Sequence, residues 1–168
     1  MICFVNKTYS MFHLSNYQAN ESTDEAMNVE PPAASDHELS PMIKAKQLYN
    51  HQTTHHFFVG DESTVELFNA LKEIALKNDH EYFGILELHP EYEAVLSMLK
   101  LLIDSVPELP ESPGYNAIQW MEDMHPNCWM AWKNATFYLS GGTTLISRFQ
   151  QYLVQRHVTS EQIHIINY

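Results

Sequence analysis

From about residue 55 to the end of the chain, short apolar runs typical of strands alternate with segments whose apolar residues recur at helical spacing. The apolar run Phe-Phe-Val at 57–59 predicts a buried strand over residues 55–60. Gly60 ends that run, and hydroxyl side chains follow that can cap a helix. Apolar residues then recur at helical spacing, which predicts a helix over residues 63–77. This part of the chain therefore predicts a strand, a glycine turn and a helix in direct succession.

The same reading predicts the remaining elements down to the C-terminus. They are strands over residues 82–88, 117–121, 136–140 and 163–166, and helices over residues 91–105 and from Thr143 or Thr144 onward. The run at 82–88 is nearly continuously apolar, as in strands that are covered on both faces. Alternating strands and helices predict an α/β fold with a mostly parallel sheet flanked by helices.

Composition divides the chain into three parts. Residues 1–17 hold enough apolar side chains to add a strand. Residues 18–50 predict a mobile acidic linker, because residues 18–42 contain six carboxylates and no basic residue. Residues 51–168 then form one α/β domain of ordinary size.

The formal net charge of -12, with nine lysines and arginines, excludes some classes of partner. Such a surface repels nucleic-acid backbones and anionic membranes. No apolar run approaches the roughly 20 residues of a membrane helix, and the first residues are apolar for too short a stretch to form a signal peptide. Cys3 and Cys128, far apart in sequence, predict reduced thiols and a cytoplasmic protein.

Two strand–glycine–helix turns carry the candidate chemistry. The first is Phe-Phe-Val-Gly-Asp-Glu-Ser-Thr, ending at Thr64, and the second is Phe-Tyr-Leu-Ser-Gly-Gly-Thr-Thr, ending at Thr144. A helix that begins directly after a strand presents backbone N–H groups that can hold a phosphate. Glycines let a ligand approach the backbone closely, although they also simply permit a positive φ.

These segments resemble the nicotinamide-binding domain of siderophore-interacting flavin reductases, a branch of the ferredoxin-NADP reductase superfamily. The first turn is similar to the family's strand followed by Gly-Asp-Glu-Thr, and the second to its later small-residue turn. The closing Ile-His-Ile-Ile-Asn-Tyr lies where those proteins end in Gly-Tyr-Trp. The similarity covers about residues 55–168.

The resemblance implies a ferredoxin reductase-like NAD(P)-binding domain that passes electrons from NADH or NADPH, through FAD, to a ferric siderophore. Those reductases place a flavin-binding barrel with an Arg-x-Tyr-Thr/Ser element ahead of this domain. About 54 residues precede the first strand here, and they lack that element. We therefore expect the nicotinamide half alone, with any FAD supplied by a partner or a missing domain.

The candidate cofactor-binding residues come from both turns and from one strand end. They are Gly60, Asp61, Ser63, Thr64, Glu87, Gly141, Gly142 and Thr143. Asp61 and Glu62 oppose phosphate binding, because carboxylates compete for the same positive helix end. An ordinary capped helix remains the alternative for the first turn.

Glu87 is expected to accept hydrogen bonds from a ribose and to repel a 2′-phosphate, with no arginine near it in sequence. NADH is then preferred to NADPH. A solvated carboxylate at a strand end is the alternative interpretation.

Other clusters point less clearly to a site. His51, His55 and His56, and separately His125 with Cys128, lack the paired ligand spacing of a zinc site. The Trp- and Met-rich segment around Trp129 and Trp132 favours packing over substrate contact. A catalytically silent interaction or homodimerisation domain is the competing hypothesis, because a bare sheet edge and an apolar loop could bury a partner.

Overall fold

The computed structural model describes residues 40–166, within a compact unit that spans residues 39–168. Its centre is a five-stranded sheet of order β3-β2-β1-β4-β5 in which every pairing is parallel. The strands are β1 (His55–Asp61), β2 (Glu81–Leu88), β3 (Asp104–Pro107), β4 (Thr136–Ser140) and β5 (Ile163–Ile166). The prediction of an α/β fold with a parallel sheet is confirmed.

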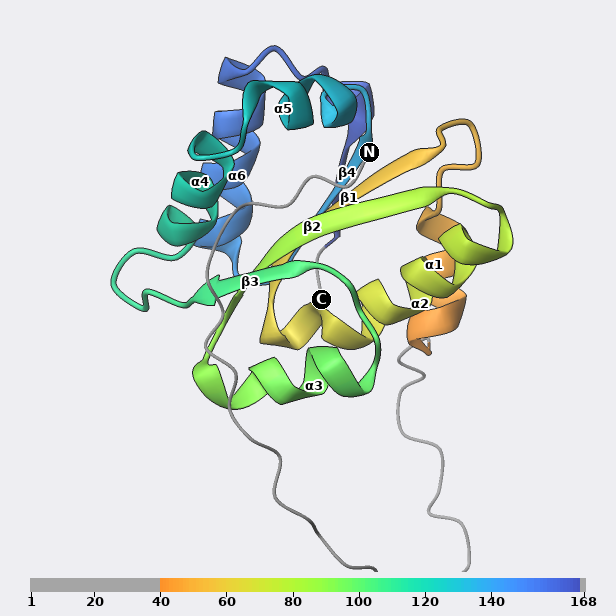
Figure 1. Ribbon diagram of the computed structural model, residues 1–168, viewed down its shortest axis with the longest axis horizontal. Helices are drawn as coiled ribbons and strands as arrows, with labels where there is room; N and C mark the ends of the chain where they lie inside the picture. The colour runs from red at the N-terminus through yellow and green to blue at the C-terminus, as the bar shows by residue number, and fades with distance from the viewer. Residues whose placement is uncertain (1–39, 167–168) are drawn as a thin grey trace, which may run out of the picture. The chain divides into compact units, whose positions relative to one another are not determined.

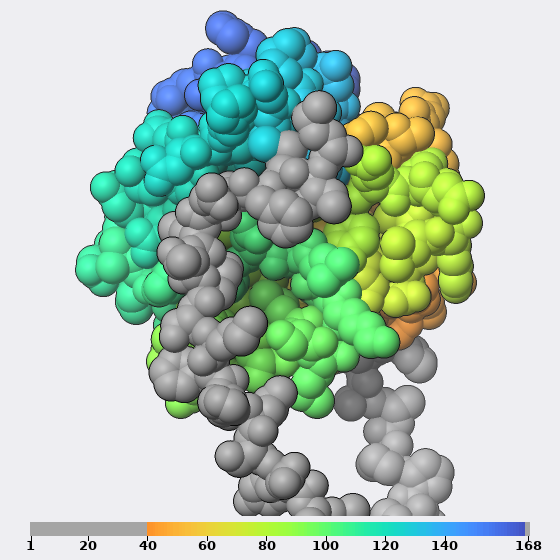
Figure 2. Space-filling model, viewed as in Figure 1, coloured from red at the N-terminus to blue at the C-terminus, as the bar shows by residue number. Residues whose placement is uncertain are grey.

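Helices cover both faces of this sheet. They are α1 (Pro41–Leu48), α2 (Val65–Lys77), α3 (Glu93–Met98), α4 (Tyr115–Glu122), α5 (Pro126–Trp132) and α6 (Thr143–Gln155), with single 3-10 turns η1 (Glu62–Thr64), η2 (Pro90–Tyr92) and η3 (Ser160–Gln162). The helices α1, α2 and α3 lie on one face and α4, α5 and α6 on the other (Figure 1). In the space-filling view, the yellow-green residues of α2 and β2 and the teal residues of α4 and α5 occupy opposite sides of the visible surface (Figure 2).

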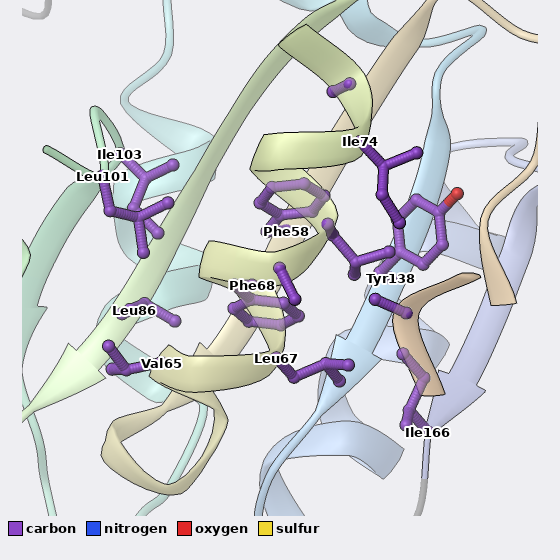
Figure 3. Packing of buried hydrophobic residues seen from close by; sticks show 14 of the residues in the cluster. Phe58, Val65, Leu67, Phe68, Ile74, Leu86, Leu101, Ile103, Tyr138 and Ile166 are labelled. Atoms are coloured by element: carbon purple, nitrogen blue, oxygen red, sulfur yellow. The ribbon is translucent and has the colours of Figure 1, made fainter. Parts of the chain in front are cut away.

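Side chains of the central strands alternate between two cores. Phe58 points to the α2 face, where its ring stacks on Phe68 with centroids 5.1 Å apart (Figure 3). Its neighbour Phe57 points to the other face and packs edge-on against Trp132 of α5. This period of two explains why Phe57, Phe58 and Val59 are all fully buried although they are adjacent in sequence. Trp132 packs in this core, as the sequence favoured.

Three sequence predictions are corrected. Residues 117–121 form part of helix α4 rather than a strand, and their buried positions, Ala117, Trp120 and Met121, follow a helical spacing. The predicted helix over residues 91–105 stops at Met98, and the chain continues into strand β3.

The predicted linker over residues 18–50 extends too far, because residues 41–48 form helix α1. Ala45 and Tyr49 of this region lie in the core against α2. The predicted segment 1–17 and the remainder of the linker, to residue 39, fall outside the described residues. Within residues 40–166, no helix combines the length and the apolar character needed to cross a membrane.

Candidate functional site

The chain order creates a switch point between β1 and β4. From β1 the chain builds outward through β2 to β3, then crosses to the other side of the sheet for β4 and β5. The connection after β1 enters α2 on one face, and the connection after β4 enters α6 on the opposite face. In open α/β sheets the crevice at the carboxyl ends of two such strands is the usual ligand-binding place.

Both predicted glycine turns lie at this switch point, and we call them together the carboxyl rim (residues 60–64 and 140–144). The carboxylate of Asp61 connects the two turns. It accepts a hydrogen bond from the Gly142 N–H at 2.7 Å and others from the Ser63 hydroxyl at 2.6 Å and backbone N–H at 3.1 Å. The sequence therefore placed seven of its eight candidate residues together, at adjacent strand ends.

The glycines of the carboxyl rim are required by crowding and by backbone conformation. A Cβ at Gly60 would overlap the Thr64 hydroxyl and lie 2.8 Å from Phe68 and 3.0 Å from the Ser140 carbonyl oxygen. Gly141 has φ +113°, which side chains with a Cβ rarely adopt. A Cβ there would also overlap the Asp61 carboxylate. These two glycines therefore keep the turns close together.

Helix α6 begins at the carboxyl rim without a side-chain cap. Its N-cap residue is Gly142, and Thr143 and Thr144 at its first two positions are exposed. The first turn of a helix carries backbone N–H groups that have no partner within the helix. In a helix of this length, they form a positive end that favours anions.

The carboxylates at the rim compete with such an anion. Asp61 already accepts the Gly142 N–H. The Oε2 atom of Glu62 is buried and has no hydrogen-bond partner within residues 40–166. Such an oxygen favours a ligand that brings a hydroxyl or amide donor.

Glu87 is bonded elsewhere. It pairs with Asp61 in the register of β1 and β2, but its carboxylate is 2 % exposed and lies beneath helix α4. Its two oxygens accept the N–H groups of Gly114 at 2.7 Å and Ala117 at 2.9 Å. Glu87 therefore holds the start of α4, and this geometry does not support the predicted ribose contact. A solvated carboxylate, the alternative considered above, is wrong.

Arg148 of α6 was not identified from the sequence. Its guanidinium donates to the Ser112 hydroxyl at 2.6 Å and to the Pro113 carbonyl at 3.1 Å, which fastens the loop before α4 to α6. Arg148 contacts the residue next to Gly114, whose N–H group Glu87 accepts. No sequence signal pointed to Arg148, because residues five apart on a helix do not share a face.

The histidines and cysteine considered for metal binding do not converge in the described residues. No group of three or more His, Cys, Asp or Glu side chains able to hold a metal ion occurs there. Cys128 is not a free thiol, so the expectation of reduced cysteines is wrong for this residue. Trp129 of α5 lies under the Arg156 guanidinium, with 4.8 Å between that group and the ring centroid. Arg156 is the C-cap residue of α6, so this contact is away from the carboxyl rim, where α6 begins.

The fold is an open α/β sheet, parallel throughout, with helices on both faces. No protein-family model matches the chain, and no curated protein matches it. Among solved structures it is similar to a flavohemoglobin from Malassezia yamatoensis with bound FAD and heme, at 13% sequence identity and a TM-score of 0.47. The similarity covers 74% of this chain and 34% of that chain, so this chain spans about a third of the flavohemoglobin's length. A similarity of this extent does not indicate a ligand.

Proposed function

We propose that this domain binds a nicotinamide dinucleotide at the carboxyl rim and presents it to a flavin held by another domain or partner. The observation that carries the proposal is the position of both glycine turns at the single switch point of the sheet. A dinucleotide lying across β1 and β4 would meet both turns at once. The fold alone would not identify this function, since α/β sheets serve many chemistries.

The parts of the ligand would divide between the two turns. A phosphate lies over the uncapped start of α6, where Thr143 and Thr144 present backbone N–H groups. A ribose donates its hydroxyls to Asp61 and to the buried oxygen of Glu62, which lacks a donor. The Asp61 carboxylate then gives up the Gly142 N–H to the phosphate.

NADH is the proposed preference over NADPH, and the carboxylates Asp61 and Glu62 replace Glu87 as the reason. They would repel a 2′-phosphate on the ribose that they hold. Arg148, the basic side chain of this region, is already bonded to the loop at Ser112 and Pro113. Reduction of a flavin and, beyond it, of a ferric siderophore is the proposed downstream chemistry, in which the cofactor supplies the hydride and the protein supplies position.

Removing one backbone donor tests this proposal. Thr143 is the first residue of α6, where proline is well tolerated, and Gly142 before it has the extended backbone that proline requires, with φ -60° and ψ 140°. Thr143→Pro should weaken NADH binding about tenfold, because a hydrogen bond to a charged phosphate is lost. Its melting temperature should stay near that of the wild type.

Ser160→Pro is the matched control. Ser160 is the first residue of η3, and Thr159 before it is also extended. This turn lies before β5, at the opposite end of the sheet, so NADH affinity should not change. Isothermal titration with NADH and NADPH, together with backbone amide NMR shifts, gives both the affinity and the place of binding. Equal affinity of both variants, or shifts outside residues 60–64 and 141–145, would refute the proposed site.

An interaction domain is the second candidate, and one surface favours it. Met98 and Leu102 are 82% and 77% exposed, and both lie in the segment that leads into the short edge strand β3. An open strand edge beside exposed apolar side chains is a common place for a second chain to pair. Absence of nucleotide binding, together with a dimer in light scattering that Met98→Glu dissociates, would favour this function.

A further inference from the structure

A cluster of histidine and tyrosine side chains lies where the strands begin, at the end of the sheet opposite to the carboxyl rim. We call it the His–Tyr cluster; its members are Tyr49, His56, His80 and Tyr138. Four different parts of the chain supply them: the end of α1, β1, the turn before β2, and β4. It shares no residue with the proposed nucleotide site, and nothing in that proposal uses it.

Hydrogen bonds join the cluster into one chain. The Nε2 atom of His56 is 3.1 Å from Nδ1 of His80, and the Tyr49 hydroxyl is 2.8 Å from the same Nδ1. The Tyr138 hydroxyl is 3.3 Å from Nδ1 of His56 and accepts the backbone N–H of Asn50 at 2.9 Å. With both imidazoles neutral, the contacts between Tyr138 and His56 and between His56 and His80 can each join a donor to an acceptor. Nδ1 of His80 has one proton or one lone pair, which His56 and the Tyr49 hydroxyl share.

The cluster fastens helix α1 to the sheet. The ring of Tyr49 packs against His56, with centroids 4.4 Å apart, and is 6 % exposed. Asn50 beside it donates its side-chain amide to Thr136 of β4 at 3.0 Å. The eight-residue helix α1 is too short to persist alone, so it depends on this anchor and on its apolar contacts with α2.

Within residues 40–166, the groups that face His56 include no carboxylate. They are His51, His80 and the hydroxyls of Tyr49 and Tyr138, with His164 of β5 edge-on against Tyr138. His55 lies on the other face of the sheet against Trp132, and its Nε2 atom is 3.6 Å from the carboxylate of Glu81. Burial raises the pKa of Tyr138 to about 12 and that of Tyr49 further, so neither hydroxyl becomes an anion that could neutralise an imidazolium.

The geometry accepts one proton but not two. One added proton leaves a lone pair on either Nε2 of His56 or Nδ1 of His80, so the N–H group of one ring still meets an acceptor on the other. When both rings are charged, two N–H groups and two positive charges face each other across 3.1 Å. The rings must then move apart, and the Tyr49 ring that packs on His56 and bonds to His80 loses its place.

We propose that the His–Tyr cluster is a proton-operated latch, in which protonation of both His56 and His80 releases Tyr49 and helix α1 from the sheet. The cluster lies in the same compact unit as the nucleotide site but at the other edge of the sheet.

The expected size of the effect follows from linkage. Burial, then the neighbouring His80, His55 and His51, lowers the pKa of His56 from 6.5 to about 4 in the latched form. In the released form the imidazole regains its ordinary pKa. Docking of α1 should therefore weaken by up to about 30-fold at pH 5 relative to pH 8.

Hydrogen exchange of the full chain at pH 7.5, 6.0 and 5.0 tests the latch. After correction for intrinsic exchange rates, residues 44–53 should lose at least about tenfold more protection than residues 145–155 of α6 by pH 5, within the limit set by linkage. A parallel loss in both segments would overturn the proposal.

Two variants and one control separate the latch from general acid sensitivity. His56→Phe keeps an aromatic ring beside Tyr49 but cannot be protonated, so the pH dependence of residues 44–53 should disappear. His80→Gln, which retains an acceptor for Tyr49, should reduce it. His89→Gln, an exposed histidine at the carboxyl end of β2, should leave it unchanged. Persistence of the wild-type pH dependence in His56→Phe would refute the latch.

Imidazole NMR on the wild type gives an answer even where a variant fails to fold. The ¹⁵N shifts of His56 and His80 report which nitrogens carry protons at each pH. The fully protonated form of His56 should appear over the same pH range in which residues 44–53 lose protection. Loss of that protection while His56 remains neutral would contradict the mechanism.

Discussion

The two ends of the parallel strands hold opposite kinds of titratable group. We call the end where the strands begin, which holds the His–Tyr cluster, the amino edge. At the carboxyl ends of the strands, Asp61 of the carboxyl rim and the buried Glu87 of β2 are acids whose carboxylates accept backbone N–H groups. At the amino edge the titratable side chains are the bases His56 and His80, which are satisfied by each other and by tyrosine hydroxyls. A parallel α/β sheet produces this asymmetry.

Helices between parallel strands all run in one direction. The helices α2 and α6 start at the carboxyl rim, which thus collects positive helix ends, and they finish at the amino edge, which collects negative ends. Acids near the first and imidazoles near the second follow that sign. His80, for example, donates its backbone N–H to Ala75 in the last turn of α2. The two ends of the sheet therefore differ in how they respond to pH. The Asp61 carboxylate accepts backbone N–H groups that do not titrate, whereas the hydrogen bonds of the His–Tyr cluster depend on the protonation of its imidazole rings.

The largest effect should come from removing the buried acid. Glu87→Ala leaves the N–H groups of Gly114 and Ala117 without acceptors in a buried place and should cost about 3 kcal/mol of unfolding free energy. Glu87→Gln, with one acceptor oxygen, should cost about half of that. Urea denaturation at pH 7.5 measures both changes.

Glu91→Ala is the control for this comparison, because Glu91 is an exposed residue in the turn after β2. Its contact with His89, at 3.8 Å, is a surface pair and should contribute little. A cost for Glu87→Ala as small as that of Glu91→Ala would show that the carboxyl rim does not depend on its acid.

The second-largest effect should be a loss of unfolding free energy on acidification, through His56 at the amino edge. The pKa of His56 is lower in the folded protein than in the unfolded chain, so the unfolded chain takes up the proton first as pH falls. The stabilisation is complete above about pH 6.5 and is lost progressively toward pH 4. By pH 5 the loss should reach at most about 2 kcal/mol.

Urea unfolding of wild type and His56→Phe across this range measures that contribution. The difference between the two proteins should shrink as pH falls, because only the wild type carries the titrating ring. A difference that stays constant from pH 7.5 to 5 would remove His56 from the account of acid sensitivity.

A third effect, similar in size to the second, should distinguish substitutions at the two adjacent glycines of the carboxyl rim. Gly141→Ala places a Cβ at φ +113° and against the Asp61 carboxylate, which should cost about 2 kcal/mol. Gly142→Ala is the matched control: its φ is -60° and its Cβ would lie 3.7 Å from the nearest atom, so stability should stay within about 0.5 kcal/mol. Equal thermal melting of the two variants would show that the turn tolerates a side chain at either place.

Local sequence pattern predicted the central strands well. The strand predicted over residues 55–60 ends one residue later, at Asp61, and that over residues 136–140 has the observed bounds. Dense apolar runs bounded by glycine leave few alternatives. Helix α1 had a signal in Ser40 followed by Pro41, a typical helix start, but the acidic composition of the preceding residues outweighed it.

The missed elements depend on contacts far apart in sequence. Strand β3, Asp-Ser-Val-Pro, has little strand propensity of its own and forms by pairing with β2. The short apolar segment at 117–121 fits a strand or a helix equally well until Glu87 fixes the start of α4. The bond from Gly142 to Asp61 joins residues 81 positions apart, so a carboxylate that sequence pattern placed against phosphate is in fact the connection between the two turns.

The Asp61 carboxylate already accepts the Gly142 N–H group. At the proposed site, a phosphate would therefore compete with a carboxylate of the same chain, whose local concentration is constant. The measured dissociation constant is then the intrinsic one divided by the fraction of molecules in which the carboxylate has swung away. A tenfold rarer vacated state raises the ligand concentration needed for half-saturation tenfold, so this one aspartate would set the threshold at which the domain responds.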